Sequence, residues 1–318
     1  MSRDARPLAV CLKGPTAVGK TTVALELART APFQIISVDS ALVYRGMDIG
    51  TAKPAPAILA QAPHRLIDIR DPWETYSAGD FRRDARAAMR EITATGQTPL
   101  LVGGTMLYFH VLQAGLAPLP EADPDLRAEI DREAADKGWP ALHDELCRVD
   151  SFAAGHIKPS DAQRIQRALE VYRLTGKPLS ELQRLTESDR DYRFLNIGLM
   201  PEDRAMLHRR IESRFRKMID SGFVQEVAGL LKHASMPEEA VSMRAVGYRQ
   251  ISQHLRDEIS LEEAERRAIV ATRRLAKRQL SWLRAEPGLL KVNCMVDDAL
   301  DHVHALLSGA KGLVQPFA

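Results

Sequence analysis

The segment GPTAVGKT, from Gly14 to Thr21, constrains the fold of this chain more than any other feature of its sequence. It fits the pattern G-x-x-x-x-G-K-[ST] without a mismatch, and it lies between an apolar run and an amphipathic stretch. Glycines let the backbone N–H groups of such a loop turn towards phosphate oxygens, and the helix that follows adds a favourable dipole. The segment therefore predicts a strand, a phosphate-binding loop (P-loop) and a helix in succession.

Two side chains of the loop have expected roles of their own. Lys20 would bring a positive charge to the outer phosphate, and Thr21 would offer its hydroxyl to Mg²⁺. The alternative is a glycine-rich turn with a chance lysine. The predicted loop comprises Gly14, Pro15, Thr16, Ala17, Val18, Gly19, Lys20 and Thr21.

Short apolar runs alternate with helix-like stretches in the first third of the chain. The runs are LAVCLKG, QIISVDS and PLLVGG, and a fourth, RFLNIGLM, follows at Arg193–Met200. Strands that alternate with helices indicate βαβ units and a parallel sheet with both faces covered. We predict an α/β fold, with a parallel sheet like that of P-loop NTPases, flanked by helices.

The character of the sequence changes between Pro118 and Tyr192. Apolar residues from Ile165 to Tyr172 recur at i, i+3, i+4 and i+7, which marks one buried helix face, and no convincing strand is present. We predict an all-helical insertion domain. The predicted division is 1–117 for the first part of the core, 118–192 for the insertion, and 193–318 for the second part, with basic C-terminal helices.

The composition of the chain indicates the cellular compartment in which we expect the protein to work. The net charge is +2, and the three cysteines lie far apart without a CxxC pair, which suits a reducing compartment. The apolar run after the N-terminus is too short for a signal peptide, and no stretch of about 18 apolar residues is uninterrupted. We expect a cytoplasmic monomer with no membrane partner.

Asp39 is the candidate carboxylate of the site. PLLVGG ends without an acidic residue, whereas QIISVDS ends in Asp39, at the edge where open α/β sheets bind ligands. Asp39 would orient metal-bound water or act as a base on a second substrate; the alternative is a cap on the next turn with Ser40. Thr105, in LVGGTMLYF, would donate to a phosphate, although tight packing explains that turn equally well.

Arg214 lies seven residues after Leu207, at the edge of the buried stripe of a predicted helix. A guanidinium at that position needs an anion, because an unpaired buried charge is costly. The anion is either a glutamate of the chain or a phosphate of the ligand.

Basic residues gather in three further segments, TRRLAKRQLSWLR, RAVGYRQ and QRIQR. A single patch of this kind is more often a solvated helix face. Three of them around a phosphate-binding core favour a polyanion longer than a nucleotide, that is, RNA or DNA.

The order of the motifs resembles that of the bacterial tRNA dimethylallyltransferases, also called tRNA isopentenyltransferases, of the IPP transferase family. The resemblance runs from about Cys11 to Arg284 and includes GPTAVGKT, VDSALVYRGMDIGTAKP, YSAGDFRRDA, LLVGGTMLY, MRAVGYRQ and ATRRLAKRQLSWLR. The second of these segments is far more specific than the P-loop alone.

The resemblance implies transfer of the dimethylallyl group of dimethylallyl diphosphate to the exocyclic N6 amine of the adenosine 3′-adjacent to the anticodon. It implies that the P-loop holds the diphosphate of the prenyl donor, although the motif is commonly associated with ATP. By the same likeness Asp39 is the general base, Thr21 the Mg²⁺ ligand, and Arg214 the arginine on the diphosphate. The Cys/His finger of eukaryotic relatives is missing, so no structural zinc is expected.

The resemblance also implies which residues meet the tRNA anticodon stem-loop. Thr105 and Arg127 match positions in the substrate channel, and Thr105 is counted with the catalytic residues. The remaining expected tRNA-binding residues are Asp39, Ser40, Ala41, Leu42, Gln163, Arg164, Ile165, Gln166, Arg167, Arg244, Ala245, Val246, Gly247, Tyr248 and Arg249.

Two other functions remain open at this point. A P-loop kinase that phosphorylates a small molecule explains the loop and Asp39 but gives the basic helices and the insertion no role. An NTP-switched RNA-binding protein explains the basic segments but gives Asp39 no chemical role.

The basic segments predict a strong dependence of tRNA binding on salt. If they contact phosphates, tRNA affinity falls steeply as salt rises, because bound counterions are released. Equilibrium binding of tRNA over a salt series checks this. A flat response would remove the support that these segments give to an RNA partner.

Overall fold

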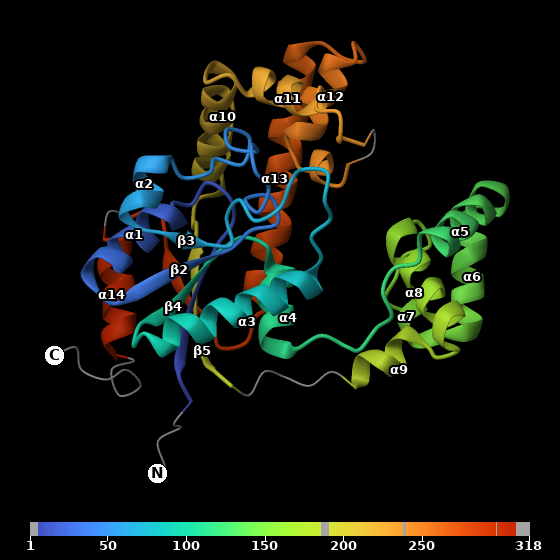
Figure 1. The fold of residues 1–318 in the computed structure, drawn as a ribbon, viewed down its shortest axis with the longest axis horizontal. Helices are drawn as coiled ribbons and strands as arrows, with labels where there is room; N and C mark the ends of the chain where they lie inside the picture. The colour runs from blue at the N-terminus through green and yellow to red at the C-terminus, as the bar shows by residue number, and fades with distance from the viewer. Residues whose placement is uncertain (1–5, 186–190, 238–239, 297, 310–318) are drawn as a thin grey trace. The chain divides into compact units, whose positions relative to one another are not determined.

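The computed structural model describes residues 6–185, 191–237, 240–296 and 298–309 (Figure 1). Within these residues one sheet of six parallel strands has the order β3-β2-β4-β1-β5-β6. The strands are β1 (Leu8–Lys13), β2 (Phe33–Val38), β3 (His64–Arg65), β4 (Thr98–Gly103), β5 (Arg193–Met200) and β6 (Leu290–Asn293). The α/β fold with a parallel sheet is therefore confirmed.

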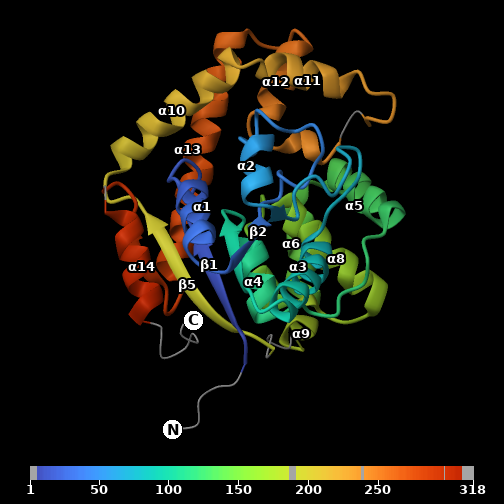
Figure 2. The ribbon, with the colours of Figure 1, turned by 60° about the vertical axis from the view of Figure 1, so that its left-hand side comes forward.

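Strand β5 joins the sheet beside β1 although about 180 residues separate them in the chain. Figure 2 shows the two strands running side by side. The sequence did not indicate β3 and β6. Both are short strands at the edges of the sheet, and neither contains the long apolar run that marks a central strand.

The helices of the same part of the chain follow or precede the strands in sequence. They are α1 (Lys20–Thr30), α2 (Pro56–Gln61), α3 (Ala78–Ala94), α4 (Met106–Ala114), α10 (Arg204–Asp220), α11 (Phe223–Leu231), α12 (Tyr248–Leu255), α13 (Leu261–Ala285) and α14 (Ala299–Gly309), with a 3₁₀ turn at Ser242–Arg244. In the part of the chain that the structure describes, no helix combines the length and the apolar character that crossing a bilayer requires.

The chain divides into two compact units, one of residues 1–112 with 190–318 and one of residues 113–189. The second unit contains α5 (Pro124–Lys137), α6 (Trp139–Val149), α7 (Ser151–Ala154), α8 (Ala162–Thr175) and α9 (Leu179–Arg184), and its described residues include no strand. Ile130, Leu142, Leu146, Ile165 and Leu169 form the centre of its own core. The sequence predicts 118 and 192 as the bounds of the insertion, whereas the compact unit has the bounds 113 and 189.

The register of the central strands determines what meets at the carboxyl edge of the sheet. Gly103, the last residue of β4, lies opposite both Lys13 of β1 and Val38 of β2. The three segments that follow these strands are the P-loop, the turn at Asp39 and the turn at Thr105. They must therefore lie together, at the edge where parallel sheets bind ligands.

Gly103 allows this close approach. A Cβ at this residue would lie 1.9 Å from the carbonyl oxygen of Val38, which is backbone and cannot rotate away. The absence of a side chain is therefore what lets the β4 turn and the β2 turn pack at this distance.

We expect Gly103→Ala to lower the free energy of unfolding of the α/β unit by about 1–3 kcal/mol, because the extra methyl group forces the two strands apart. The control is Gly229→Ala in α11, where an added Cβ meets nothing within 4 Å. That change should raise stability by up to about 1 kcal/mol, since glycine is a poor helix former. Thermal or denaturant unfolding measures both, and equal stability of Gly103→Ala and the unchanged chain would contradict the packing argument.

Candidate functional site

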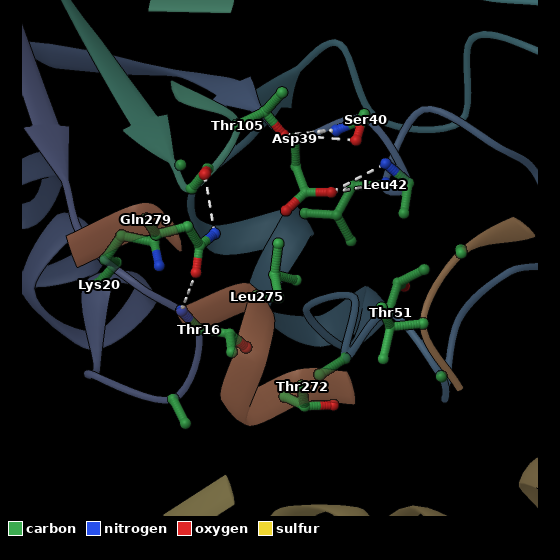
Figure 3. A pocket seen from close by; sticks show the side chains of 18 of the residues that line it. Thr16, Lys20, Asp39, Ser40, Leu42, Thr51, Thr105, Thr272, Leu275 and Gln279 are labelled. Atoms are coloured by element: carbon green, nitrogen blue, oxygen red, sulfur yellow. Dashed lines mark hydrogen bonds between the residues drawn. The ribbon is translucent and has the colours of Figure 1, made fainter. Parts of the chain in front are cut away.

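A pocket of about 540 Å³ lies at this carboxyl edge (Figure 3). It is bordered by the P-loop, by the turns after β2 and β4, and by helices α10 and α13. All residues that line it belong to the α/β unit. Among them are Lys20, Thr21, Asp39, Thr105 and Arg214, so the structure brings the predicted catalytic residues together.

The P-loop has the backbone geometry of an anion cradle. A Cβ on Gly14 would lie 2.9 Å from the carbonyl oxygen of Leu199, so the loop passes too close to β5 for any side chain. Ala17 and Gly19 have left-handed backbone angles, φ 66° and 88°. Helix α1 begins at Lys20, and no side chain caps its N-terminus. Its first N–H groups are therefore open to an anionic ligand.

Lys20 lies against its own loop. Its Nζ donates hydrogen bonds to the carbonyl oxygens of Gly14 (3.0 Å) and Pro15 (2.7 Å). Burial lowers the pKa of Lys20 to about 8, although the nearby Asp39 carboxylate acts in the opposite direction. A phosphate in the loop would give this ammonium a stronger partner than the two carbonyls.

Asp39 caps the turn that follows it, which is the alternative role that the sequence left open. Its Oδ1 accepts from the backbone N–H groups of Ala41 (2.9 Å) and Leu42 (3.3 Å). Its other oxygen has no hydrogen-bond partner among the described residues. Figure 3 shows the carboxylate inside the pocket, with one oxygen directed to Leu42 and the other away from the turn. One oxygen thus orients the group and the second is open to a ligand.

Thr105 connects the β4 turn to the Asp39 turn. Its hydroxyl accepts from the backbone N–H of Ser40 (3.1 Å) and donates to the Ser40 hydroxyl (3.4 Å). Its own backbone N–H donates to the carbonyl of Val38 (3.3 Å). The threonine hydroxyl is thereby engaged with Ser40, and it fixes the peptide that follows Asp39.

Gln279 of α13 is a site residue that our sequence analysis missed. Its Nε2 donates to the carbonyl of Gly104 (2.8 Å), and its Oε1 accepts from the backbone N–H of Thr16 (3.1 Å) (Figure 3). The side chain, which is 8% exposed, clamps the P-loop to the β4 turn. A signal was present, because Gln279 lies between Ala276 and Leu280 on the apolar face of the helix, and a buried polar residue there is informative.

Arg214 is half-buried and has no acidic partner among the described residues. No carboxylate of the described residues lies within 4.0 Å of its guanidinium, which instead donates to the carbonyl of Thr51 (3.3 Å). Burial lowers the pKa of Arg214, and Asp39 acts against that shift. The glutamate alternative is thus not realised in the described structure. A buried cation without an acidic partner favours an anionic ligand.

The pocket offers oxygen donors of the kind that Mg²⁺ prefers. Thr21 and Asp39 both line it, and the described residues contain no group of three or more His, Cys, Asp or Glu side chains that could hold a metal ion by itself. Mg²⁺ is commonly held by one or two protein oxygens together with the phosphates of a substrate and water. These residues fit Mg²⁺ bound in that way.

The segment from Arg244 to Arg249 forms another part of the pocket wall. Arg244, Ala245 and Val246 line the pocket, and so does Tyr248, whose ring is fully buried. The Tyr248 hydroxyl donates to Glu226 (2.6 Å). Arg249 is exposed.

The helical unit holds its own group of predicted residues. Arg127 and Arg167 both bind the buried carboxylate of Glu170, at 2.8 Å and 2.7 Å. Burial alone would raise the pKa of Glu170, but the two arginines lower it below its usual range. Ile165 is part of the core, whereas Gln163 and Arg164 are exposed. The Gln166 amide, the remaining member of the predicted segment, donates to Asp131 (2.7 Å).

The basic face of α13 is largely exposed. Arg273 binds Glu212 of α10 (2.9 Å), whereas Arg274, Lys277 and Arg284 are exposed to solvent. Arg278, also exposed, borders the pocket. Positive charge therefore continues from the pocket onto the surface of this helix.

Comparison with known proteins reveals close similarity over nearly the whole chain. The model of the IPP transferase family matches residues 42–286. A tRNA dimethylallyltransferase of Thioalkalivibrio sulfidiphilus is 56% identical over 91% of both chains, and one of Thiobacillus denitrificans is 52% identical over 98% of this chain and 100% of its own. The crystal structure of a tRNA isopentenylpyrophosphate transferase from Bacillus halodurans is similar with a TM-score of 0.71, at 36% identity and 96% coverage of both chains.

The low pKa of Lys20 predicts that binding of inorganic diphosphate weakens as the pH rises through about 8. Below that pH the amine is charged and attracts the anion; above it the free protein has lost this proton and must regain it on binding. Lys20→Arg should bind with a flatter profile between about pH 7 and 9.5, because a guanidinium keeps its proton. Calorimetric titration at several pH values measures both proteins, and the variant corrects for titration of the ligand. Parallel profiles would show that Lys20 does not titrate in this range.

Proposed function

The chain belongs to the IPP transferase family, and from this premise we propose that it is a tRNA dimethylallyltransferase. The reaction moves the dimethylallyl group of dimethylallyl diphosphate to the exocyclic N6 amine of the adenosine 3′-adjacent to the anticodon, and it releases diphosphate. The observation that carries the proposal is a single pocket. It combines a P-loop, a half-buried arginine without a carboxylate of the described residues within 4.0 Å, and an aspartate with one oxygen available to a ligand.

The P-loop and two cations would act on the leaving group. When the allylic C–O bond breaks, its electron pair stays on the diphosphate, so negative charge increases there. The open N–H groups at the start of α1, together with Lys20 and Arg214, would stabilise that charge where it develops. Because these groups are already in place, little reorganisation is needed during the reaction. Bound Mg²⁺, held through Thr21, would add further neutralisation of the diphosphate.

Asp39 would act on the nucleophile. The N6 amine of adenine is a poor nucleophile until it begins to lose a proton. As the new N–C bond forms, the proton would pass to the Asp39 oxygen that the turn leaves free. The capping bonds to Ala41 and Leu42 would keep the carboxylate in place meanwhile. We therefore assign Asp39 as the general base and Thr105 as the residue that positions its turn.

The adenine must leave its stack to enter the pocket, since an amine inside a stacked loop cannot reach the donor. We propose that the Arg244–Arg249 segment, the Asp39–Leu42 turn and Arg278 contact the anticodon stem-loop, supported by their places along the pocket. We further propose that the helical unit contributes Gln163 and Arg164, which are exposed, and the partly exposed Arg127 and Arg167.

The remaining expectations concern where and how the protein works. We propose a cytoplasmic monomer. Cys11, Cys147 and Cys294 form no disulfide, which supports a reducing compartment. ATP is not needed for this reaction, although the loop has the motif that nucleotide-binding proteins use.

Asp39→Asn is the variant that tests the proposed chemistry. The amide keeps an oxygen to cap the turn but cannot accept the amine proton, so prenyl transfer should fall by about 10² to 10⁴-fold. Binding of tRNA should be retained. Incorporation of the prenyl group into tRNA, followed by mass spectrometry, measures the rate, and filter binding measures the affinity.

The same assay, run with ATP added, distinguishes prenyl transfer from the two other candidate functions. Release of ADP from ATP without any gain of mass on the RNA would favour a kinase. An NTP-switched binding protein would bind tRNA and modify nothing, with the aspartate present or replaced. Either result with the unchanged chain would overturn the proposed function.

A further inference from the structure

Glu226 lies behind the pocket and does not line it, yet four donors converge on its carboxylate. It is in the first turn of α11. Its Oε2 accepts from the backbone N–H groups of Asp48 (3.0 Å) and Ile49 (2.7 Å). Its Oε1 accepts from the N–H of Gly50 (3.2 Å) and from the hydroxyl of Tyr248 (2.6 Å). These bonds join three segments that are far apart in the sequence.

The arrangement requires a carboxylate. An ionised carboxylate only accepts hydrogen bonds and has about four lone-pair sites, which matches four donors. A glutamine at the same position would direct two N–H groups at donors. Burial, with Glu226 as a further cause, raises the pKa of Tyr248, so the phenol keeps the proton that it donates.

The three backbone bonds of Glu226 fix the loop at Asp48–Ala52, which includes Thr51, the hydrogen-bond partner of Arg214. Gly50 is the last of the three residues whose N–H is bonded to Glu226, and it lines the pocket together with Thr51 and Ala52. Gly50 is pressed against aromatic rings, because a Cβ there would lie 2.1 Å from Phe223. The carbonyl of Thr51 accepts from Arg214 at 3.3 Å. A shift of this loop would therefore move the oxygen that holds the guanidinium.

The other bond fixes a second segment of the pocket wall. Tyr248 is the first residue of α12, and the residues just before it, from Arg244 to Val246, line the pocket. Its ring meets Phe223 edge to face, with centroids 4.9 Å apart. Glu226 therefore connects the wall that holds Arg214 to the wall that we assign to tRNA.

We propose that Glu226 is a positioning residue for prenyl transfer, which sets the place of Arg214 through the loop at Asp48–Ala52 and that of the Arg244–Val246 wall through Tyr248. The inference rests on the proposed function. It assigns a role to a side chain that touches neither the donor nor the RNA.

Glu226→Gln tests this role. The change should lower kcat about 10- to 100-fold, since it loses charge-assisted hydrogen bonds that hold a leaving-group contact. Glu258→Gln is the matched control, because Glu258 is exposed and faces Arg256 only at 3.9 Å. Its rate should equal that of the unchanged chain. Tyr248→Phe removes one of the four bonds and keeps the ring, so its rate should fall in the same direction by less.

A double-mutant cycle separates positioning from general loss of structure. If Glu226 acts largely through Arg214, Glu226→Gln should cost less than about threefold in an Arg214→Ala background, because coupled residues are non-additive. A loss by the same factor in both backgrounds would overturn the proposal. If Glu226→Gln does not fold, Tyr248→Phe tests the proposal in its place. Full activity of Tyr248→Phe would then overturn it.

Binding of inorganic diphosphate distinguishes this proposal from the proposed function. It needs neither tRNA nor a prenyl donor, and Glu226→Gln should weaken it about tenfold through Arg214. If the unchanged chain transfers no prenyl group, the proposed function fails while this titration still tests the link to Arg214. If transfer is normal and Glu226→Gln binds diphosphate as tightly as the control, the positioning role is wrong.

Discussion

The site depends on two cations, Lys20 and Arg214, that share a pocket with Asp39 but have no carboxylate of the described residues within 4.0 Å. Arg214 is half-buried and donates to the backbone carbonyl of Thr51, and Lys20 donates to the carbonyls of its own loop. Burial lowers the pKa of both groups, which shows that the protein gives them less stabilisation than water would. In the proposed function a diphosphate would supply the missing charge, so donor binding and stabilisation of the leaving group would arise from one arrangement.

The close packing of the strand ends makes that arrangement possible. Gly103 and Gly104 bring the β4 turn against β2 and the P-loop, and Gln279 bonds to both the P-loop and the Gly104 carbonyl. Thr105 then holds the peptide after Asp39. Asp39 and the P-loop are consequently held by the same few contacts.

Much of this architecture was predictable because it is encoded locally. The P-loop, the central strands and the helix periods each depend on adjacent residues, and the position of Asp39 follows from its strand. Glu226 acts through partners that lie far away in the chain, so no local pattern reveals it. The place of Gln279 on an apolar helix face indicates that it is buried, but its partner Gly104 is equally distant in the chain, so its role could not be predicted. The segments that we expect to bind tRNA contain both exposed residues and residues that stabilise the fold. Tyr248 and Ile165 are buried, and Arg127 and Arg167 bind Glu170, because a helix inevitably directs part of any motif inward.

The most direct measurement is a crystal structure of the protein with a non-reactive analogue of the prenyl donor and an anticodon stem-loop. The account predicts the diphosphate on the N–H groups at the start of α1, in contact with Lys20 and Arg214. It also predicts the target N6 amine within hydrogen-bond reach of the free oxygen of Asp39. A nucleobase far from that oxygen, or a diphosphate bound outside the P-loop, would contradict it.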